Sequence, residues 1–600
     1  TLSPSSAASD VYKRQIVGYH NDITNTLRLW SAELPPSVTQ TYYSQAQRDR
    51  ISEISKVLYP DDSNSAGQQL RLRQEYFFSS AGVQSIVRDF CATHHGMRSL
   101  GKKIAIHIND THPTLVIPEM MRLLMDEHHC SWDVAWTLTT QVMSYTNHTI
   151  LQEALETWPI GMFQGLLPRI YQIIVEIDRR YRAQQTPIFG KALVDLTAPL
   201  GNGQVRMAHL AVIGSHSVNG VAPLHTELLK TDVLRGLYQV YPERFNNKTN
   251  GIATRRWVQL ANQPLSQLID QTIGSSWRRQ PDLLQTLLPY QQDDHFLHQL
   301  AQVKLTNKQA LAAYVQRTMG IKLRTDAIYD VQIKRLHAYK RQLLHVFEIL
   351  REYFVIKDHP DQPVVPRVHI FGAKAAPSYH YAKAIIKLIN VVADMVNQDP
   401  VIGDRLKVVF IPNYGVSIAE LIIPAADVSE QISTASKEAS GTSNMKLMAN
   451  GALSLATYDG ANIDIMQAAG AENEYPFGLR VHEVYDYYQR GNYRAAAFYN
   501  GNPELKRILD SLINGTIPGI PTVGREIYDS LIRYNDEFFV LADYQAYVKQ
   551  QQQISQDFQD QPTWQQRALA NIAASGHFAA DLAVARYADD IWQVPHDRLN

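Results

Sequence analysis

The sequence predicts an α/β protein of at least two domains, in which short parallel strands alternate with helices. Its 600 residues exceed the roughly 100–200 residues of one typical domain. Its second half alternates short apolar runs with stretches of helical periodicity, and polar or glycine-containing turns separate them. Such an alternation predicts a parallel sheet whose ligands bind beyond the carboxyl ends of the strands.

The strands and helices of the second half follow from two different periods. Short apolar runs that end in glycine or polar residues predict buried strands over residues 364–371, 406–411 and 453–457. Apolar side chains that recur with a period of about 3.6 residues predict a helix over residues 380–396. A second, shorter helix is expected over residues 417–423.

The first half is less regular. A strand is expected over residues 103–108, because apolar side chains alternate there and turn residues follow. Helices are expected from there to Leu124 and over residues 132–145, and a further strand over residues 205–214. The polar, glycine-containing segment 245–257 separates two differently organised halves and marks a domain boundary.

This boundary and the first residues divide the chain into three parts. Residues 1–15 are rich in serine and alanine and show no period, so a non-native or disordered leader is expected there. Residues 16–248 are expected to form the remainder of an N-terminal domain. Residues 249–600 are expected to form a C-terminal domain.

Bulk composition excludes several functional classes. The 57 basic and 58 acidic residues give a formal net charge of −1, without the basic excess of a nucleic-acid-binding protein. The two cysteines, Cys91 and Cys130, do not make a disulfide framework, which favours a reducing, cytoplasmic location. No apolar run reaches the roughly 18 residues of a membrane span, and we expect no secretory signal. Neither nucleic acid nor a membrane is expected as a partner.

The segment 438–446, EASGTSNMK, has the composition of an anion site. Its small and hydroxyl-bearing residues let backbone N–H groups approach an anion closely, and the N-terminus of a helix beginning there would add a favourable dipole. Lys446 can form a Schiff base with an aldehyde cofactor. A capped helix with a surface lysine fits the same residues, so both interpretations stay open on spacing alone.

Two basic pairs, Lys334-Arg335 and Lys340-Arg341, surround the expected start of a helix. An apolar stripe from Leu336 onwards predicts that the helix begins near that residue, with Lys334 and Arg335 at its N-terminal end. Cations at that end oppose the helix dipole by about 0.3–1 kcal/mol. A bound anion would remove this conflict, which favours an anion site over a solvated basic helix face.

Two further groups of residues are less specific. Asn147-His148 and Asn250 suit sugar hydroxyls, which need donors and acceptors in fixed geometry, although a lone histidine is more often structural. The pairs His94-His95 and His128-His129, the latter followed by Cys130, match no zinc-ligand spacing, so no metal site is predicted.

Taken in order, these segments resemble those of the glycogen and maltodextrin phosphorylase family. The resemblance runs from Val17 to the C-terminus, and EASGTSNMK at 438–446 is similar to the family's pyridoxal phosphate signature. The other matching motifs are NDTHPT at 109–114, YTNHT at 145–149, AHLAVIGSHSVNGVA at 208–222, NKTNGI at 247–252, VQIKRLHAYKRQ at 331–342, GAKAAPSYHYAK at 372–383, NYGVSIAE at 413–420 and PAADVSEQISTA at 424–435. Motifs this numerous, in this order, make the resemblance specific.

The resemblance implies a glycosyltransferase fold of GT-B type, with two Rossmann-like domains and a central cleft. It implies that Lys446 holds pyridoxal 5′-phosphate within the C-terminal domain. The cofactor pocket would be formed by Lys334, Lys340, Gly441 and Thr442 around the phosphate, with Tyr339, Tyr414 and Trp257. The implied substrate-binding residues are His148, Asn250, Glu438, Ser440 and Gly441 at the glucose, Arg335 at the substrate phosphate, Asp62 on a mobile gate loop, and Asp110. The implied catalytic residues are Lys334, Arg335, Lys340, His148 and Glu438.

The implied reaction is the reversible phosphorolysis of a terminal α-1,4-linked glucose of glycogen or maltodextrin, with retention, giving α-glucose 1-phosphate. The cofactor would act as general acid and base through its phosphate, because a phosphate monoester has a second pKa of about 6. The implied partners are an α-1,4-glucan, inorganic phosphate or glucose 1-phosphate, and a second copy of the chain in a homodimer.

One part of the family pattern has no counterpart in this sequence. The family's N-terminal stretch supplies a glycine-rich site for the substrate phosphate and regulatory sites in some members, so an N-terminally truncated chain is expected. Two alternatives therefore stay open: a glucan-binding fragment without turnover, and a nucleotide-sugar glycosyltransferase of the same fold. Formation of glucose 1-phosphate from maltodextrin and phosphate, without a nucleotide, distinguishes a phosphorylase from the glycosyltransferase.

Overall fold

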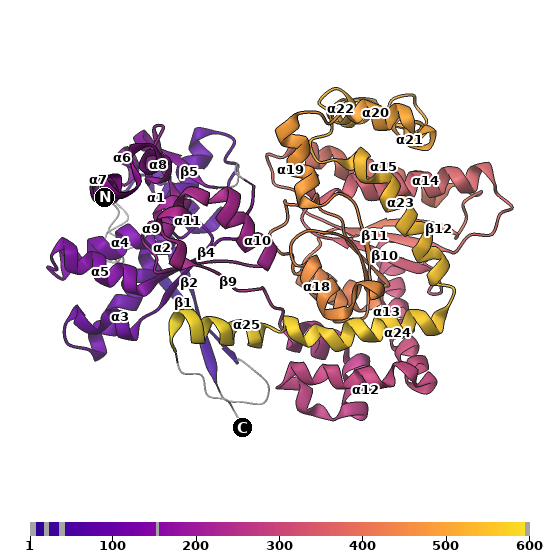
Figure 1. The fold of residues 1–600 in the computed structure, drawn as a ribbon, viewed down its shortest axis with the longest axis horizontal. Coiled ribbons are helices and arrows are strands. Elements are labelled where there is room, and N and C mark those ends of the chain that lie inside the picture. The colour runs from indigo at the N-terminus through magenta and orange to yellow at the C-terminus, as the bar shows by residue number, and fades with distance from the viewer. Residues whose placement is uncertain (1–7, 17–22, 35–42, 152–154, 595–600) are drawn as a thin grey trace. The chain divides into compact units, whose positions relative to one another are not determined.

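The computed structural model describes residues 8–16, 23–34, 43–151 and 155–594, which divide into two compact units (Figure 1). Unit 1 comprises Thr1–Val221, His225–Lys248 and Arg586–Asn600. Unit 2 comprises Ala222–Leu224 and Thr249–Ala585. The chain leaves unit 1 after Lys248 and returns to it within helix α25, Ala580–Tyr587.

Unit 2 is built on a six-stranded sheet whose neighbouring strands are all parallel. Its strands are β10 Ile328–Ile333, β11 Arg367–Gly372, β12 Leu406–Phe410, β13 Val428–Gln431, β14 Leu453–Thr457 and β15 Tyr475–Phe477. Their order across the sheet is β12-β11-β10-β13-β14-β15. Counted along the chain, this is the 3-2-1-4-5-6 order of a doubly wound Rossmann sheet. The predicted α/β class with parallel strands is confirmed.

Helices cover both faces of this sheet (Figure 1). On one face α14, α15 and α23 share an apolar cluster with Ile328, and on the other α13, α16 and α24 share a cluster with Val331. The helices of unit 2 are α12 Gln263–Ile273, α13 Asp294–Met319, α14 Gln342–Asp358, α15 His380–Gln398, α16 Val416–Ala425, α17 Ser443–Met448, α18 Asn462–Ala469, α19 Val481–Arg490, α20 Ala495–Gly501, α21 Pro503–Ser511, α22 Pro521–Ile532, α23 Val540–Asp557 and α24 Gln561–Ala574.

The strongest sequence periods of unit 2 give the expected elements. The helix expected over residues 380–396 is confirmed as α15, whose buried face includes Ile385, Leu388 and Ile389. Each such side chain contributes about 1.5–3 kcal/mol when it leaves water. The strands expected over residues 406–411 and 453–457 are confirmed as β12 and β14.

Unit 1 has a four-stranded parallel sheet of order β3-β4-β8-β9 and two small antiparallel sheets, β1-β2 and β5-β7-β6. Its strands are β1 Ala8–Ile16, β2 Thr24–Ala32, β3 Ile106–Asn109, β4 Met143–Thr146, β5 Thr157–Pro159, β6 Leu200–Gly201, β7 Gln204–Arg206, β8 Ser217–Gly220 and β9 Phe245–Asn247. Its helices are α1 Gln45–Lys56, α2 Ser65–Thr93, α3 Leu100–Lys103, α4 Val116–Arg122, α5 Trp132–Val142, α6 Ile160–Leu166, α7 Pro168–Phe189, α8 Lys191–Thr197, α9 Met207–Ile213 and α11 Arg235–Val240, while α10 Pro223–Leu228 carries residues of both units. Across the described part of the chain, no helix combines the length and the apolar character that crossing a bilayer requires.

Some sequence expectations for unit 1 are wrong. The strand expected over residues 205–214 is replaced by the short β7 and the helix α9, in which every side chain except His209 is buried. A helix buried all round has no amphipathic period, so its apolar run cannot be told from a strand. The helix expected over residues 132–145 ends at Val142, and β4 follows it directly.

The N-terminal expectations also need correction. The strand expected from residue 103 begins at Ile106, because α3 extends to Lys103. The disorder expected over residues 1–15 does not hold for Ala8–Gln15, which lie in β1 and pair with β2 in antiparallel register. Residues 1–7 lie outside the described residues.

Candidate active site

The candidate site of unit 2 lies where the strand order of its sheet reverses. β10 has β11 on one side and β13 on the other, so the connections after β10 and β13 diverge. Doubly wound sheets bind ligands at this switch point, beyond the carboxyl ends of the strands. Lys334 and Arg335 follow β10 directly, and the segment 438–446 follows β13. The topology therefore brings together the two segments that the sequence identifies as anion sites.

The basic segment does not lie at a helix N-terminus, so that part of the sequence argument is wrong. α14 begins at Gln342, not near Leu336, and a 3₁₀ turn at Ala338–Lys340 precedes it. Arg341 has a left-handed φ of +54°, which a local helical pattern does not predict. Its buried guanidinium pairs with Asp543 at 2.6 Å and donates to the Ile432 carbonyl at 2.7 Å. These long-range contacts stabilise the turn.

Lys340 and Glu438 form an ion pair at the switch point. The Lys340 Nζ lies 2.8 Å from the Glu438 Oε2, and the Tyr339 hydroxyl donates to the same oxygen at 3.3 Å. Burial works to raise the pKa of Glu438, but the ammonium groups of Lys340 and Lys334 outweigh it and lower the pKa below its ordinary value. Glu438 is therefore an ionised acceptor at neutral pH.

Lys334 is joined to the same site through Gln431, which the sequence analysis missed. Its Nζ donates to the Gln431 Oε1 at 2.7 Å, and the Gln431 Nε2 lies 3.4 Å from the Ser443 Oγ at the start of α17. Burial, together with the neighbouring charge of Lys340, lowers the pKa of Lys334 to about 8. An anion near Lys334 and Lys340 would relieve the repulsion between the two cations.

The loop between β13 and α17 is held in a shape that requires glycine. Gly441 has a φ of +79°, and a Cβ there would come within 3.2 Å of the Asn444 side chain. The Asn444 Nδ2 donates to the Ser440 carbonyl at 3.2 Å, while the Ser440 Oγ donates to the Gly441 carbonyl at 2.9 Å. Thr442 precedes α17 without a side-chain cap, so its hydroxyl does not satisfy the first N–H groups of that helix.

Lys446 lies one turn into α17 with its amine against an aromatic face. Its Nζ is 4.4 Å from the centre of the Trp257 ring. Among the residues that the structure describes, no hydrogen bond or ion pair engages this amine. Burial lowers the pKa of Lys446, which increases the fraction of neutral, nucleophilic amine.

Two buried polar residues that the sequence analysis missed hold this arrangement. The Asn450 Nδ2 donates to the carbonyls of Trp257 and Lys446, each at 2.9 Å. Asp459 accepts from the Glu438 N–H at 2.8 Å and the Ser436 N–H at 2.9 Å, and burial raises its pKa to about 6. Asp459 lies just beyond β14, and a polar residue at the carboxyl end of a strand is the signal that could have found it.

Three other predicted residues are not joined to this cluster by hydrogen bonds among the described residues. Arg335 is exposed, and its guanidinium has no ion pair in the described chain. Tyr414 packs against the end of β11, where a Cβ on Gly372 would lie 2.8 Å from its ring, and burial raises its pKa to about 12. Asn250 is half-buried next to Ile252, which bridges to Ala579.

The corresponding strand ends of unit 1 carry neutral and acidic groups. The His148 Nε2, beyond β4, lies 2.6 Å from the Asn109 Oδ1 at the end of β3. Burial lowers the pKa of His148, so the ring is neutral at pH 7. Asp110 has a left-handed φ of +63°, and its carboxylate accepts from the Thr111 N–H at 2.7 Å.

Asp62 and Asp110 belong to one charged cluster of unit 1. Asp62 pairs with Arg71 at 3.2 Å, and Arg71 pairs with Glu156 at 3.2 Å. His112 lies 3.6 Å from Glu156 and 3.9 Å from Asp110. The hydrogen bond to Glu156 raises the pKa of His112.

Two groups of side chains in the described chain bring potential metal-ligand atoms within 4.8 Å of one another. They are Asp330, His345 and His369, and Glu75, His112 and Glu156. Neither group contains His94, His95, His128 or His129. In the second group Arg71 already pairs with both Glu75 and Glu156.

Comparisons with known proteins cover almost the whole chain. The profile of a family described as carbohydrate phosphorylase matches residues 4–594. The glycogen phosphorylase of Bacillus subtilis (strain 168) is 47% identical over 586 residues, which are 97% of this chain and 73% of that protein. The muscle form of glycogen phosphorylase from Oryctolagus cuniculus is 44% identical over 608 residues, 98% of this chain and 72% of that protein. The brain form from Ovis aries is 44% identical over 602 residues, 97% of this chain and 71% of that protein.

Proposed function

Since the chain belongs to the carbohydrate phosphorylase family, we propose that it catalyses the reversible phosphorolysis of terminal α-1,4-linked glucose. Its substrates are glycogen or maltodextrin and inorganic phosphate, and its product is α-D-glucose 1-phosphate with retained configuration. The relatives named glycogen phosphorylase support this reaction. The observation that carries the proposal is the half-buried Lys446 amine, which lies against the Trp257 ring and which no hydrogen bond engages among the described residues.

The residues at the switch point fit pyridoxal 5′-phosphate. Lys446 would bind its aldehyde carbon, because an amine of lowered pKa is nucleophilic near neutral pH. Lys334 and Lys340 would bind its phosphate together with the loop at Gly441 and Thr442, and Trp257, Tyr339 and Tyr414 would complete the pocket. When bound, the cofactor supplies a phosphate monoester with a second pKa of about 6, suited to general acid and base chemistry.

The cationic side chains would stabilise negative charge during the reaction. Lys334 and Lys340 approach the site from the β10 side and are fixed by Gln431 and Glu438. Preorganised cations of this kind stabilise a transition state more than flexible ones, because they need no reorganisation as charge develops. The exposed guanidinium of Arg335 would bind inorganic phosphate through its two parallel donors.

The polar groups would bind the transferred glucose. Glu438 is ionised, so it would accept from a sugar hydroxyl and would not serve as an acid. In the neutral His148 ring the Nε2–H donates to Asn109, which leaves the Nδ1 lone pair to accept from a sugar hydroxyl. Asn250 and Ser440 would add further donors and acceptors, and Asp62 and Asp110 of unit 1 would bind the glucan.

Production of glucose 1-phosphate from maltodextrin and phosphate tests the proposal. We expect it in protein reconstituted with pyridoxal 5′-phosphate and without any nucleotide. Activity that requires a nucleotide sugar would instead identify a nucleotide-sugar glycosyltransferase. Maltodextrin binding without turnover in the reconstituted protein would identify a glucan-binding protein without catalytic activity.

Two properties implied by the family resemblance belong to the same proposal. We propose that the protein forms a homodimer and acts in the cytoplasm. Sedimentation velocity on the reconstituted protein measures the first property, and a monomer at micromolar concentration would contradict it.

A further inference from the structure

A column of buried ionisable and polar side chains lies beneath the candidate site of unit 2. It contains Asp330 and Gln332 on β10, His369 on the adjacent β11, and His345 on α14. Each has at most 1% of its surface exposed. Apolar side chains of similar size stabilise a core at least as well as buried ionisable groups, so stability alone does not explain this column.

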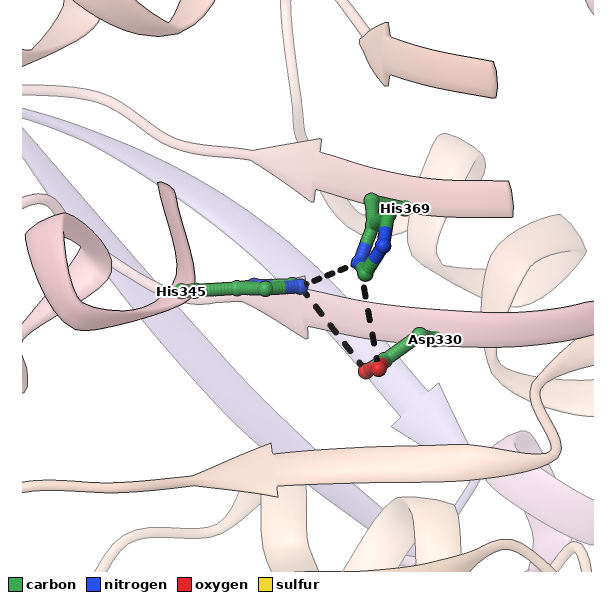
Figure 2. Close-up of side chains that lie close together, drawn as sticks. All are labelled: Asp330, His345 and His369. Atoms are coloured by element: carbon green, nitrogen blue, oxygen red, sulfur yellow. Dashed lines mark hydrogen bonds and ion pairs between the residues drawn. The ribbon is translucent and has the colours of Figure 1, made fainter. Parts of the chain in front are cut away.

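Three members of the column, Asp330, His345 and His369, point toward one another from different elements (Figure 2). Their ligand atoms lie within 4.8 Å, but the two histidine nitrogens that face each other are already hydrogen-bonded. The His345 Nε2 and the His369 Nδ1 are hydrogen-bonded to each other at 2.7 Å. Arg367 already pairs with the Asp330 carboxylate at 3.1 Å. The two histidines therefore belong to a hydrogen-bonded chain, and Arg367 supplies a cation beside Asp330.

The direction of each hydrogen bond in this chain follows from the end at the Lys340 carbonyl. The Lys340 carbonyl can only accept, so the Gln332 Nε2 donates to it, at 3.1 Å. The Gln332 Oε1 then accepts from the His345 Nδ1–H at 3.2 Å. Burial and the charge at His369 hold the pKa of His345 well below its ordinary value, so this ring is neutral and its Nε2 accepts.

The other end of the chain, at His369 and Glu352, carries charge. His369 donates from Nδ1 to His345, and its Nε2 lies 2.8 Å from the carboxylate of Glu352. Burial acts to raise the pKa of Glu352, but Arg367 and His369 lower it to about 2, so the carboxylate accepts at this end of the chain. His369 thus bridges His345 and Glu352. The Arg367 guanidinium lies between the two carboxylates, 3.1 Å from Asp330 and 3.6 Å from Glu352.

We propose that Gln332, His345, His369 and Glu352 form a positioning network that holds the turn carrying Lys340 against the candidate phosphate site. The network ends on the Lys340 carbonyl, in the turn whose Lys340 Nζ reaches Glu438 at 2.8 Å. Hydrogen bonds in a buried chain polarise one another, and a charged end strengthens this effect. The inference rests on the proposed function, because the ligand that Lys340 is positioned to bind is the cofactor phosphate.

Gln332→Glu tests the network with the smallest change of shape. A glutamate still accepts from His345, but it places an oxygen where Gln332 donates to the Lys340 carbonyl. We expect the affinity of the apoprotein for pyridoxal 5′-phosphate to fall by about tenfold or more, as for a lost buried hydrogen bond, and its affinity for pyridoxal to stay unchanged. Equal losses for both ligands, or no loss for either, would overturn the proposal.

Leu344→Ala is the matched control, because Leu344 is buried in the apolar cluster on the same helix and its side chain has no group that can join the hydrogen-bonded chain. It should lower stability and leave the ratio of the two affinities unchanged. A crystal structure of the Gln332→Glu protein is a readout that needs no cofactor. We expect the Lys340–Glu438 distance to exceed the 2.8 Å of the native protein, and an unchanged distance would contradict the network.

Nitrogen-15 spectra of the histidine rings test the hydrogen-bond order directly. His345→Gln and His369→Gln variants assign the two rings. We expect His345 to be protonated on Nδ1 alone and His369 to carry a proton on Nδ1, which it donates to His345. A His345 proton on Nε2 would overturn the network whether or not the cofactor binds. A native protein that binds neither pyridoxal nor its phosphate would instead overturn the proposed function.

Discussion

The two parallel sheets of this protein end in opposite chemistry. In unit 2 the segments after β10 and β13 carry Lys334, Lys340 and Lys446. The cations of Lys334 and Lys340 suit a phosphate, and the amine of Lys446 suits an aldehyde. In unit 1 the segments after β3 and β4 carry Asp110 and a neutral His148, which suit hydroxyl groups. One architecture, strands with polar residues beyond their carboxyl ends, thus supports two kinds of recognition. Under the proposed function, unit 2 would bind the phosphates, and the strand ends of unit 1 would bind sugar hydroxyls only.

The largest expected effect comes from the Lys446 amine. Lys446→Ala should lower the rate of glucose 1-phosphate formation by about 1,000-fold or more, because the other groups of the site act only with the cofactor in place. A coupled assay that detects glucose 1-phosphate measures the loss. Lys387→Ala, at an exposed position of α15, is the control that should keep native activity. Activity retained in Lys446→Ala would remove the cofactor role from this residue.

The next effect concerns the ion pair at the switch point. Lys340→Gln should reduce kcat by about 100–1,000-fold, the range seen when one preorganised group that stabilises charge is removed. The free energy of unfolding of the variant should change little by comparison, since glutamine has a side chain of similar length. Steady-state kinetics at saturating maltodextrin measure kcat. A change in the KM for maltodextrin without a change in kcat would contradict this role and would instead indicate that Lys340 binds the glucan.

A smaller effect is expected from His148 of unit 1, and it tests whether this unit binds the glucan and not the cofactor. His148→Ala should lower kcat/KM for maltodextrin by about 10–100-fold, as for the loss of a hydrogen bond to a substrate hydroxyl. The affinity of the apoprotein for pyridoxal 5′-phosphate should stay as in the native protein, which fluorescence titration measures. Weakened cofactor binding in this variant would break the contrast between the two sheets.

The smallest effect is a pH dependence confined to unit 2. The pKa of Lys334 is about 8, below its ordinary value, so the free site loses this cation as pH rises through 8. Phosphate binding needs the protonated form, so the affinity for pyridoxal 5′-phosphate should fall above pH 8 by at most about tenfold per pH unit. Pyridoxal, which has no phosphate, should lack this component. Lys334→Arg, whose side chain stays charged, should abolish it, and a persistent slope would assign the titration elsewhere.

Sequence alone predicts the parts of this molecule that local patterns determine. The period of α15 and the apolar run of β14 identify those elements, and contiguous motifs predict Lys446 and Glu438 as site residues. The residues that hold the site are distant in the sequence. Asn450 binds the Trp257 carbonyl across 193 positions, and no local pattern encodes such a contact.

The turn at Lys340 illustrates a different limit. Its apolar stripe predicts a helix from Leu336, yet the backbone takes a left-handed residue at Arg341 before α14 begins. The buried ion pair with Asp543 and the hydrogen bonds to the loop after β13 offset the local preference. A pattern that counts only neighbours along the chain cannot include these tertiary contacts.

Covalent trapping tests the central claim most directly, namely that the Lys446 amine holds the cofactor. The protein is reconstituted with pyridoxal 5′-phosphate, reduced with borohydride and digested, and the labelled peptide is identified by mass spectrometry. We predict one pyridoxyl group, on the Lys446 of the segment 438–446. A label on another lysine, or no label after reconstitution, would contradict the account.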